Sequence, residues 1–281
     1  MESLWSIATL YSLSFGTSAF AQLVQVFFIF LIAYTVLYLG AGVLNVVGIY
    51  SRATQVLLPN LYDNSTTITI PQNPNERSAI TIYPSVNAPA GMEFSYAAWI
   101  LLNKSTFGAG SNGLRHIFHK GSATYKPLMC PGVFVKENDN TLVVHMNEAG
   151  DWNTSCELPN IPVGKFFHLA IVVRNMNVDM YINGNIAYRM QLKSIPRQNF
   201  GDVYAFSTQT INDSAMNPDK PLIVAGAAQG LLSRLTYTGY ALNYEQIDRM
   251  IRDGPSTKLV SSTQNLPPYF ADSWWVTYTR P

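Results

Sequence analysis

Residues 166–190 read FFHLAIVVRNMNVDMYINGNIAYRM, and this stretch decides the fold. Three short runs of β-branched, aromatic and aliphatic residues are separated at Asn175–Asn177 and at Asn183–Gly184. Asn and Gly tolerate the positive φ of a type I′ turn, so an Asn-Gly pair between two such runs indicates a hairpin. Alternate positions of the first run are hydrophobic, as expected of a strand with one face on a core: Phe167, Leu169, Ile171 and Val173. The stretch predicts a β-meander, which needs the rest of the chain to complete a sandwich.

The composition leaves room for one sandwich domain and a membrane segment. The chain has 281 residues, of which 48% are hydrophobic. Only 12% are charged, about half the share of an ordinary soluble domain, and no Lys or Arg precedes Arg52. The net charge of +1 and the even scatter of basic residues argue against nucleic-acid binding.

A transmembrane helix is predicted over residues 23–50, because this stretch carries no charge and would be about 40 Å long as a helix. The residues expected to anchor it are Leu23, Val26, Phe27, Phe30, Ile32, Leu37, Leu39, Val43 and Val46. Residues 1–22 form a hydrophobic segment, interpreted either as a helix at a membrane interface or partner surface, or as an unstructured leader. No basic residue begins this segment, which argues against a cleaved signal peptide.

The orientation in the membrane stays open. Arg52 follows the helix and nothing basic precedes it, which weakly favours a cytosolic C-terminal part. Four glycosylation sequons, at Asn64, Asn103, Asn153 and Asn212, favour the opposite side. They carry little weight, because a chain rich in Asn, Ser and Thr contains such triplets by chance.

After a predicted linker at 51–59, the sequence predicts a sandwich domain over residues 60–255. Its expected strands are separated by polar turns at the spacing of an all-β sandwich: 66–70, 79–83, 93–102, 114–120, 132–136, 141–146, the meander, 222–227 and 230–240. Asn243 is the expected N-cap of a short helix that ends before Gly254-Pro255. Residues 256–281 form an aromatic tail.

Six of these pieces, in order, resemble the laminin-G-like, concanavalin A-like jelly-roll family. They are Phe94–Trp99, Phe118–Gly121, Phe166–Ala170, Tyr181–Gly184, Leu222–Gly226, and Leu231–Tyr237 followed by the helix at Tyr244–Ile251. The resemblance implies an all-β antiparallel jelly-roll sandwich, here preceded by one transmembrane α-helix.

The whole chain resembles membrane-anchored minor capsid proteins of large icosahedral double-stranded DNA viruses. This resemblance implies a non-enzymatic structural protein that links an internal viral membrane to the capsid shell and contacts other virion proteins. The expected partner-binding residues lie in the tail: Trp274, Trp275, Tyr269 and Phe270. The alternative is a membrane-anchored, surface-displayed lectin-like module that binds glycans through Trp152, Asn153 and Tyr204.

Catalysis is not expected. Glucanases of this fold need two carboxylates around the scissile bond, and Asp179, Glu137 and Asp139 make no such pair. His116 and His119 are expected on opposite strand faces, and His168 is interpreted as a satisfied structural histidine.

Cofactors are not predicted either. Asp151, Asp202 and Asp213 could each offer one ligand to calcium at a loop, although no calcium-loop spacing is present. Cys130 and Cys156 could form a disulfide or stay free, and the sequence leaves both possibilities open.

Overall fold

The computed structural model describes residues 19–260, apart from positions 77, 84, 86, 89–90, 109–112 and 216–219. The chain forms two compact units, Met1–Arg52 and Ala53–Pro281. The predicted partner-binding residues of the tail, from Tyr269 to Trp275, lie outside the described residues.

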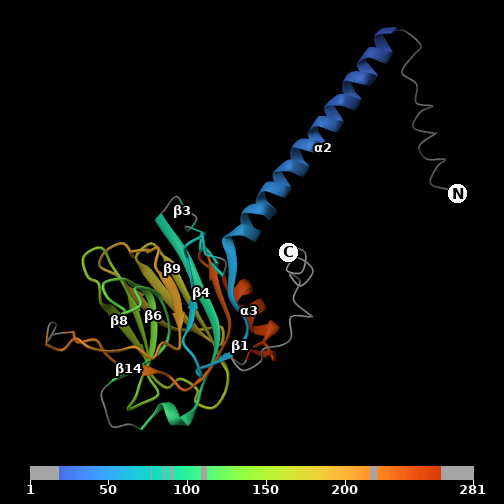
Figure 1. Ribbon diagram of the computed structural model, residues 1–281. Coiled ribbons are helices and arrows are strands. Elements are labelled where there is room, and N and C mark those ends of the chain that lie inside the picture. Colours follow the sequence, from blue (N-terminus) through green and yellow to red (C-terminus); the bar gives the residue numbers. More distant parts are fainter. Residues whose placement is uncertain are drawn as a thin grey trace, which may run out of the picture. The chain divides into compact units, whose positions relative to one another are not determined.

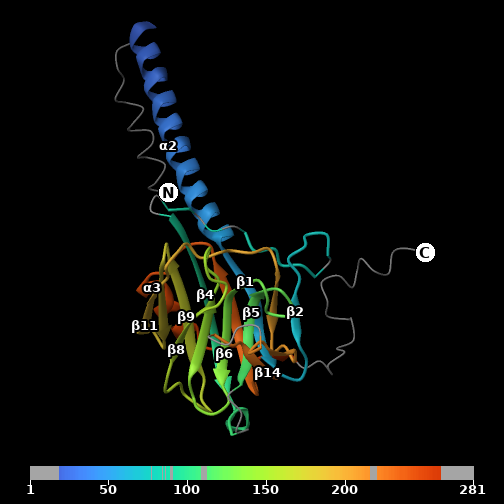
Figure 2. The same ribbon diagram turned by 90° about the vertical axis from the view of Figure 1, so that its left-hand side faces the viewer.

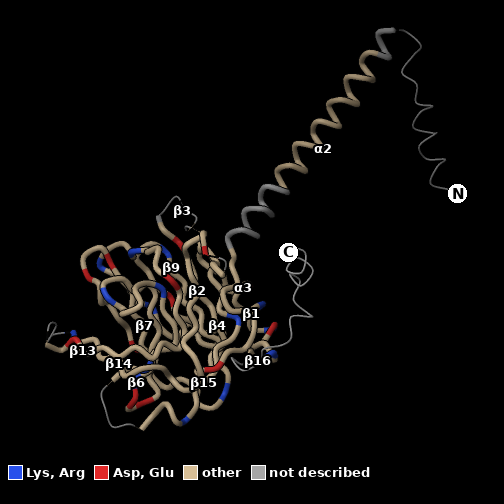
Figure 3. The backbone as a smooth tube through the Cα atoms, viewed as in Figure 1, with Lys and Arg blue, Asp and Glu red and all other residues tan. Residues whose placement is uncertain are grey.

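The first unit contains the helix α2, which spans Ala19–Ala53. No Pro and no charged residue occurs in this helix before Arg52, and Figure 3 shows none along its described length. Leu23–Val43 has a mean hydropathy of 2.3 and is long enough to cross a membrane. The predicted N-terminal apolar helix is therefore present, beginning at Ala19 instead of Leu23 and ending at Ala53 instead of Tyr50. Such a helix is compatible with a single-pass membrane anchor and with a signal sequence.

The predicted anchor residues lie on this helix, and those whose side chains are described are all exposed. For example, Leu23 and Phe30 are each 71% exposed and Leu37 is 73% exposed. The side chain of Val46 lies outside the described part of the chain. Burial within the protein therefore does not explain the apolar character of the helix.

The second unit is a sandwich of two sheets (Figures 1 and 2). Sheet A contains, in spatial order, β11 (Asn185–Gln191), β10 (Asn177–Ile182), β9 (Phe167–Arg174), β4 (Gly91–Leu102), β15 (Gly230–Thr238), β1 (Thr54–Asp63) and β16 (Leu259–Val260), with β3 (Asn87–Ala88) beside β4. Sheet B contains β13 (Thr210–Asn212), β14 (Ile223–Ala227), β5 (Leu114–Gly121), β6 (Met129–Lys136), β7 (Leu142–Met146) and β8 (Thr154–Leu158); β12 (Asp202–Ala205) pairs with β5 and with β2 (Ile68–Ile70). A short 3-10 helix, η1, spans Lys104–Thr106. The predicted all-β jelly-roll sandwich is confirmed.

The predicted meander is the antiparallel set β9, β10 and β11. Its second turn has Asn183 at φ 51° and Gly184 at φ 83°, the two positive values of a type I′ turn. Alternate residues of β9 face the core as expected, and Phe167 and Ile171 are fully buried there. The core lies between the sheets and also contains Phe94, Ile100 and Phe118, which lie on β4 and β5.

The helix α3 (Tyr244–Asp253) packs on the face of sheet A that is turned away from sheet B (Figure 1). Asn243 caps it as predicted, since its side chain accepts a hydrogen bond from the Gln246 N–H. The Gln246 side chain in turn accepts from the Asn243 N–H, which completes a capping box. Ile247 is buried against small residues of the sheet, among them Ala97 and Ala170.

Several segments differ from the sequence-based expectation. Residues 51–59, predicted to be a linker, contain the end of α2 and the first half of β1. Residues 79–83, predicted to be a strand, belong to no strand: the Ile80 N–H donates to the Pro71 carbonyl oxygen, and the Gln72 side chain bonds to Ile80 and Ile82. β16 also brings residues 259–260, predicted to belong to the tail, into sheet A.

Cys130 and Cys156 are both buried and free. The sulfur of Cys156 lies 3.2 Å from the sulfur of Met180. Burial raises the pKa of each cysteine thiol to about 12, so both are protonated at neutral pH. The disulfide that the sequence allowed is therefore not formed.

Candidate functional site

Sheet B carries a row of aromatic and histidine rings on the face turned away from the main core. The Tyr204 ring stacks on His119 with centroids 5.0 Å apart, and His119 lies 4.9 Å from Tyr125. The row continues through Phe134 to His145, whose centroids are 5.4 Å apart. Tyr125 is completely buried over this face. The row is therefore a second, covered core and not an open cleft.

The prediction that His116 and His119 point to opposite faces is wrong. The pairing of β5 with β6 shifts register between His116 and Phe118, and such a bulge interrupts the alternation of side chains. Both imidazoles consequently lie on the outer face, with His119 Nδ1 2.8 Å from His116 Nε2.

Their hydrogen bonds determine both tautomers. The Ser207 N–H donates to His116 Nδ1 over 2.9 Å, so the proton of His116 is on Nε2 and is donated to His119 Nδ1. His119 then donates from Nε2 to the Ser122 carbonyl oxygen over 2.9 Å. Burial lowers the pKa of His119 to about 4, and burial reinforced by His119 holds the pKa of His116 well below its usual value. Both rings are neutral at pH 7 and connect β5 to two loops.

The glycan-binding candidates do not form one site. Asn153 is 5% exposed, and its side chain bonds to His145 Nδ1 and to the Lys220 carbonyl oxygen. Trp152 lies beside it, with the Lys126 ammonium 5.0 Å from the indole centroid. Tyr204 is on β12, which is separated from β8 by the strands β5, β6 and β7.

The carboxylates that were considered for calcium or catalysis are engaged with cations or backbone groups. Asp151 pairs with Lys220 and Asp213 with Lys126, while Asp202 accepts from the Gln72 N–H. Among the described residues, no three His, Cys, Asp or Glu side chains form a possible metal site. The residues present therefore do not fit the calcium ion that some laminin-G-like domains hold.

The two candidate acids, Glu137 and Asp179, are also paired. Glu137 is buried and contacts Arg115, and Asp179 accepts two hydrogen bonds from Arg189, at 2.5 and 2.9 Å. These ion pairs hold both carboxylates within the fold.

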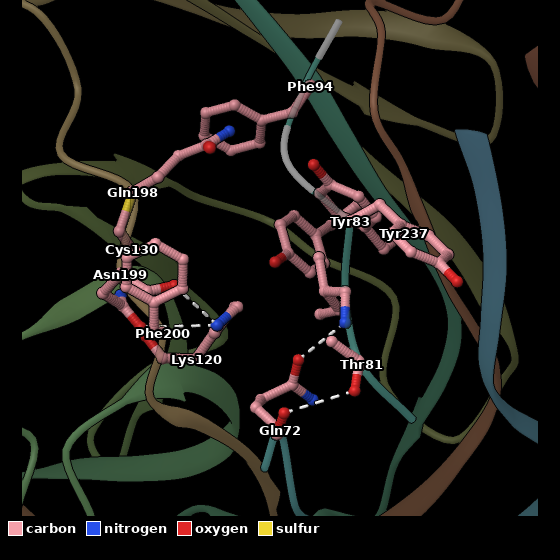
Figure 4. Close-up of a pocket in the computed structure, with 12 residues that line it drawn as sticks. Gln72, Thr81, Tyr83, Phe94, Lys120, Cys130, Gln198, Asn199, Phe200 and Tyr237 are labelled. Carbon is pink, nitrogen blue, oxygen red and sulfur yellow. Dashed lines mark hydrogen bonds between the residues drawn. The ribbon is translucent and has the colours of Figure 1, made fainter. Parts of the chain in front are cut away.

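A pocket of about 100 Å³, the rim pocket, opens between the loops at 72–83 and 198–200 (Figure 4). Several of its polar side chains are hydrogen-bonded within the protein, among them Gln72, Lys120 and Asn199. Lys120, 6% exposed, donates to the carbonyl oxygens of Asn199 and Gly201 at 2.8 and 2.7 Å. Burial lowers the pKa of Lys120 to about 8. By contrast, Tyr83 and Phe200 are 56% and 92% exposed and lie on opposite sides of the pocket in Figure 4.

A larger pocket of about 360 Å³ lies on the outer face of sheet A and is called here the Trp99–His168 pocket. Trp99 and His168 are neighbours on β4 and β9, with their rings edge to face at 5.3 Å. Trp99 Nε1 and His168 Nδ1 are buried without a hydrogen-bond partner among the described residues. Burial also lowers the pKa of His168 to about 4, so its ring is neutral. His168 is therefore buried like a structural histidine, but its Nδ1 lacks the hydrogen-bond partner that a satisfied ring would have.

The other residues of the Trp99–His168 pocket combine charged and apolar groups. Arg234 and Asp253 lie 4.0 Å apart and are both partly exposed. The remaining lining is given by Thr54, Val56, Pro59, Ala97, Thr236 and Met250. The pocket thus offers donors and an acceptor beside an indole ring and aliphatic side chains.

Sequence reasoning did not identify this pocket, although one signal was available. Trp99 alternates with the core residues of β4, which places a large aromatic side chain on the outer face of the sheet. Its partners Arg234 and Asp253 come from β15 and the end of α3, so only the sheet order brings them together.

Solved structures with a similar fold include bacterial toxin domains. The binding domain of Paraclostridial Mosquitocidal Protein 1 is 12% identical, with a TM-score of 0.49 over 72% of this chain and 46% of that chain. The receptor binding domain of botulinum neurotoxin mosaic serotype C/D is 11% identical, with a TM-score of 0.48 over 72% of this chain and 45% of that chain. The botulinum neurotoxin serotype G binding domain is 13% identical, with a TM-score of 0.46 and coverages of 72% and 46%. The chain spans less than half the length of each.

A comparison with curated protein sequences gave no match. The family model for the concanavalin A-like lectin/glucanases superfamily matches residues 74–222, which is more than half of the 281-residue chain. The matched stretch includes the predicted meander and all strands from β4 to β13. The chain belongs to the concanavalin A-like lectin/glucanases superfamily.

Proposed function

We propose that this protein is a membrane-anchored, non-catalytic module that binds a carbohydrate in the Trp99–His168 pocket. The observation that carries the proposal is the pair of buried nitrogen atoms, Trp99 Nε1 and His168 Nδ1, that have no hydrogen-bond partner among the described residues and belong to two residues that line this pocket. Leaving such a group without a hydrogen bond costs about 1–3 kcal/mol, and most buried polar groups in folded proteins have a partner. A ligand that supplies the missing partners would be favoured.

The chemistry of the Trp99–His168 pocket fits a sugar. A hydroxyl group both donates and accepts, and the pocket offers the indole N–H and the Arg234 guanidinium as donors beside the Asp253 carboxylate as an acceptor. The C–H face of a sugar ring is apolar and suits the Trp99 ring and the side chains of Val56 and Met250. The volume of about 360 Å³ lies within the usual range for small-molecule sites.

The carboxylates favour binding over hydrolysis. Glucanases of this superfamily require an acid and a second carboxylate on either side of the scissile bond. Among the residues that line the Trp99–His168 pocket, Asp253 is the one carboxylate. Glu137 and Asp179, the candidates elsewhere in the domain, are held by Arg115 and Arg189.

Membrane anchoring is the second part of the proposal and rests on α2. Its apolar stretch from Leu23 to Val43 has exposed side chains, and exposed apolar surface of this extent is stable in a lipid bilayer. The helix leads directly into β1, so the anchor and the binding domain share one continuous chain.

A virion role, in which the sandwich bridges an internal membrane to a capsid shell, remains a prediction from the sequence. It depends on Trp274 and Trp275, which lie outside the described residues. No feature of the described sandwich favours it over the carbohydrate-binding role, for which the Trp99–His168 pocket gives a site.

The test is binding of the full-length protein in detergent to an array of neutral and acidic oligosaccharides. Trp99→Phe keeps an aromatic ring but removes the N–H, and we expect it to weaken binding about tenfold, the equivalent of about 1.4 kcal/mol. Trp152→Phe is the matched control on sheet B and should bind like the wild type. Loss of binding in Trp152→Phe alone would move the site to sheet B, and no binding by the wild type would refute the proposed function.

A further inference from the structure

The exposed apolar side chains of the sandwich gather at one end. The strand register identifies this end: Thr54, the first residue of β1, pairs with Thr238 of β15, which pairs with Ser95 of β4. Farther across the sheet, Glu93 of β4 pairs with Arg174 of β9. The loops at this end carry five exposed large hydrophobic residues, which together are called here the entry rim: Tyr83, Met176, Ile195, Phe200 and Tyr244.

Hydrogen bonds locate each part of the entry rim. The Tyr83 N–H donates to the Gln55 side chain, one residue after the start of β1. Met176 lies in the turn between β9 and β10, and its carbonyl oxygen accepts from the Leu192 N–H at the beginning of the loop that carries Ile195 and Phe200. Leu242, two residues before Tyr244, donates its N–H to the Ser95 hydroxyl. The five residues therefore come from three loops and from the start of α3, which meet at the same end.

Fewer exposed large hydrophobic residues lie elsewhere on the described sandwich. Val56, two residues after Thr54, is exposed near the same end, and the exposed large hydrophobic residues elsewhere on the described sandwich are Ile186, Tyr188, Leu259 and Val260. Phe200 is 92% exposed, and Figure 4 shows it at the rim pocket, across from Tyr83. Between Arg174 and Phe200 the one acidic residue, Asp179, is buried, whereas Arg174, Lys193 and Arg197 at this end are exposed. Exposed aromatic and basic side chains together are typical of surfaces that meet lipid headgroups.

The short connection between α2 and β1 identifies the lipid bilayer as the partner of the entry rim. The uncharged sequence of α2 continues to Ser51, and Thr54 begins the sandwich directly after Ala53. At 1.5 Å per helical residue, Tyr50 is only about 6 Å along the helix from Thr54. A helix that is buried in a bilayer up to Tyr50 therefore leaves no spacer between the headgroup region and the end of the sandwich where β1 begins.

We infer that the entry rim is a membrane-contacting surface, and that Phe200, Ile195 and Tyr83 insert among the headgroups of the bilayer that α2 spans. This inference rests on the proposed membrane anchoring. The contact would hold the sandwich against the lipid surface by the rim and leave the outer face of sheet A open to solvent.

The experiment uses the full-length protein in phosphatidylcholine vesicles that contain a lipid with a spin-label quencher. A small thiol-reactive fluorophore is attached to single introduced cysteines, Phe200→Cys and Ile195→Cys at the entry rim. The native Cys130 and Cys156 are only 3% and 6% exposed, so the wild type should take up no label. The matched control is Ser105→Cys in η1, which lies at the opposite end because Asn103 bonds to Gln229 beside the first residue of β15.

We expect a headgroup-region quencher to reduce the fluorescence of both rim labels and to leave the Ser105→Cys label at the level seen without quencher. A fourth label, at Val36→Cys in α2, reports on the anchor by quenching from lipids labelled deep in the acyl chain. Equal, low quenching at the rim and at Ser105→Cys, with Val36→Cys quenched, would overturn this inference and leave the anchor intact. An unquenched Val36→Cys label would overturn the anchor and the inference together.

Discussion

The buried histidines give the folded protein a stability that depends on pH. Burial lowers the pKa of His119, His145 and His168 to about 4, whereas the usual value is 6.5. Between these values the unfolded chain binds protons that the folded chain excludes, so the free energy of unfolding falls as the pH decreases from 6.5 to 4. The stabilising contribution of the three neutral histidines is fully present above pH 6.5.

We therefore expect urea unfolding, followed by circular dichroism, to show a lower free energy of unfolding at pH 5 than at pH 7. Each histidine contributes a slope of at most about 1.4 kcal/mol per pH unit within this window. His119→Gln should reduce the slope, because one titrating ring is removed. An unchanged free energy of unfolding between pH 7 and pH 5 would show that the buried imidazoles accept protons in the folded state.

At this scale, the sequence predicted residue types better than residue contacts. The alternation along β4 places Trp99 on the face opposite the core residues, but nothing in the sequence around Ile117 indicates the bulge that brings His116 and His119 together. A bulge depends on the pairing with β6, which is a tertiary interaction. The unpartnered nitrogen atoms of Trp99 and His168 could not be predicted for the same reason, because the hydrogen-bond partners of a side chain depend on the neighbouring strands.

Individual elements were predictable where local chemistry decides them. The meander and its type I′ turn follow from Asn183-Gly184, and the start of α3 follows from Asn243. β1 differs from the predicted linker at 51–59, and Pro59 within it is accommodated by a register shift against β15 between Leu58 and Leu61. The segment at 79–83 alternates in sequence as a strand does, but its partners include the side chains of Gln72 and Gln55, which no alternation reveals.

The cap of α3 gives a prediction for one element. Asn243→Ala removes the hydrogen bond to the Gln246 N–H and should lower the free energy of unfolding by about 1 kcal/mol, as measured by chemical denaturation. Gln246→Ala removes the side-chain bonds of Gln246 and keeps the cap itself, so we expect a smaller loss. If both variants unfold like the wild type, the capping box does not stabilise the helix on sheet A.

The boundaries of the sandwich give a prediction for the whole molecule. A fragment of residues 53–260 contains every strand of both sheets and should unfold cooperatively without detergent. A fragment of residues 60–255, the boundaries predicted from the sequence, loses Leu57 and Leu58, which are 1% and 3% exposed in the core. Removing a buried leucine side chain costs about 2–5 kcal/mol, so this shorter fragment should be unstable or unfolded.

The thermal melts of the two fragments, recorded by circular dichroism, provide the measurement. Equal melting temperatures would mean that β1 adds nothing to the sandwich and that residues 51–59 act as a linker after all. A cooperative transition for residues 53–260 alone would show that the described strands suffice for the fold without α2 and without the tail.

The position of β1 in sheet A also determines the order of events during synthesis. Its two neighbours are β15 and β16, so residues 54–63 cannot begin to pair until residues 231–238 have been made, and the second edge of β1 is covered only when residues 259–260 follow. At about 5–20 residues per second, the ribosome needs roughly 10–40 s to extend the chain from β1 to β16. During this interval at least one edge of β1 has no strand partner. A translocation machine or a chaperone therefore has time to act on α2 before the sandwich is complete.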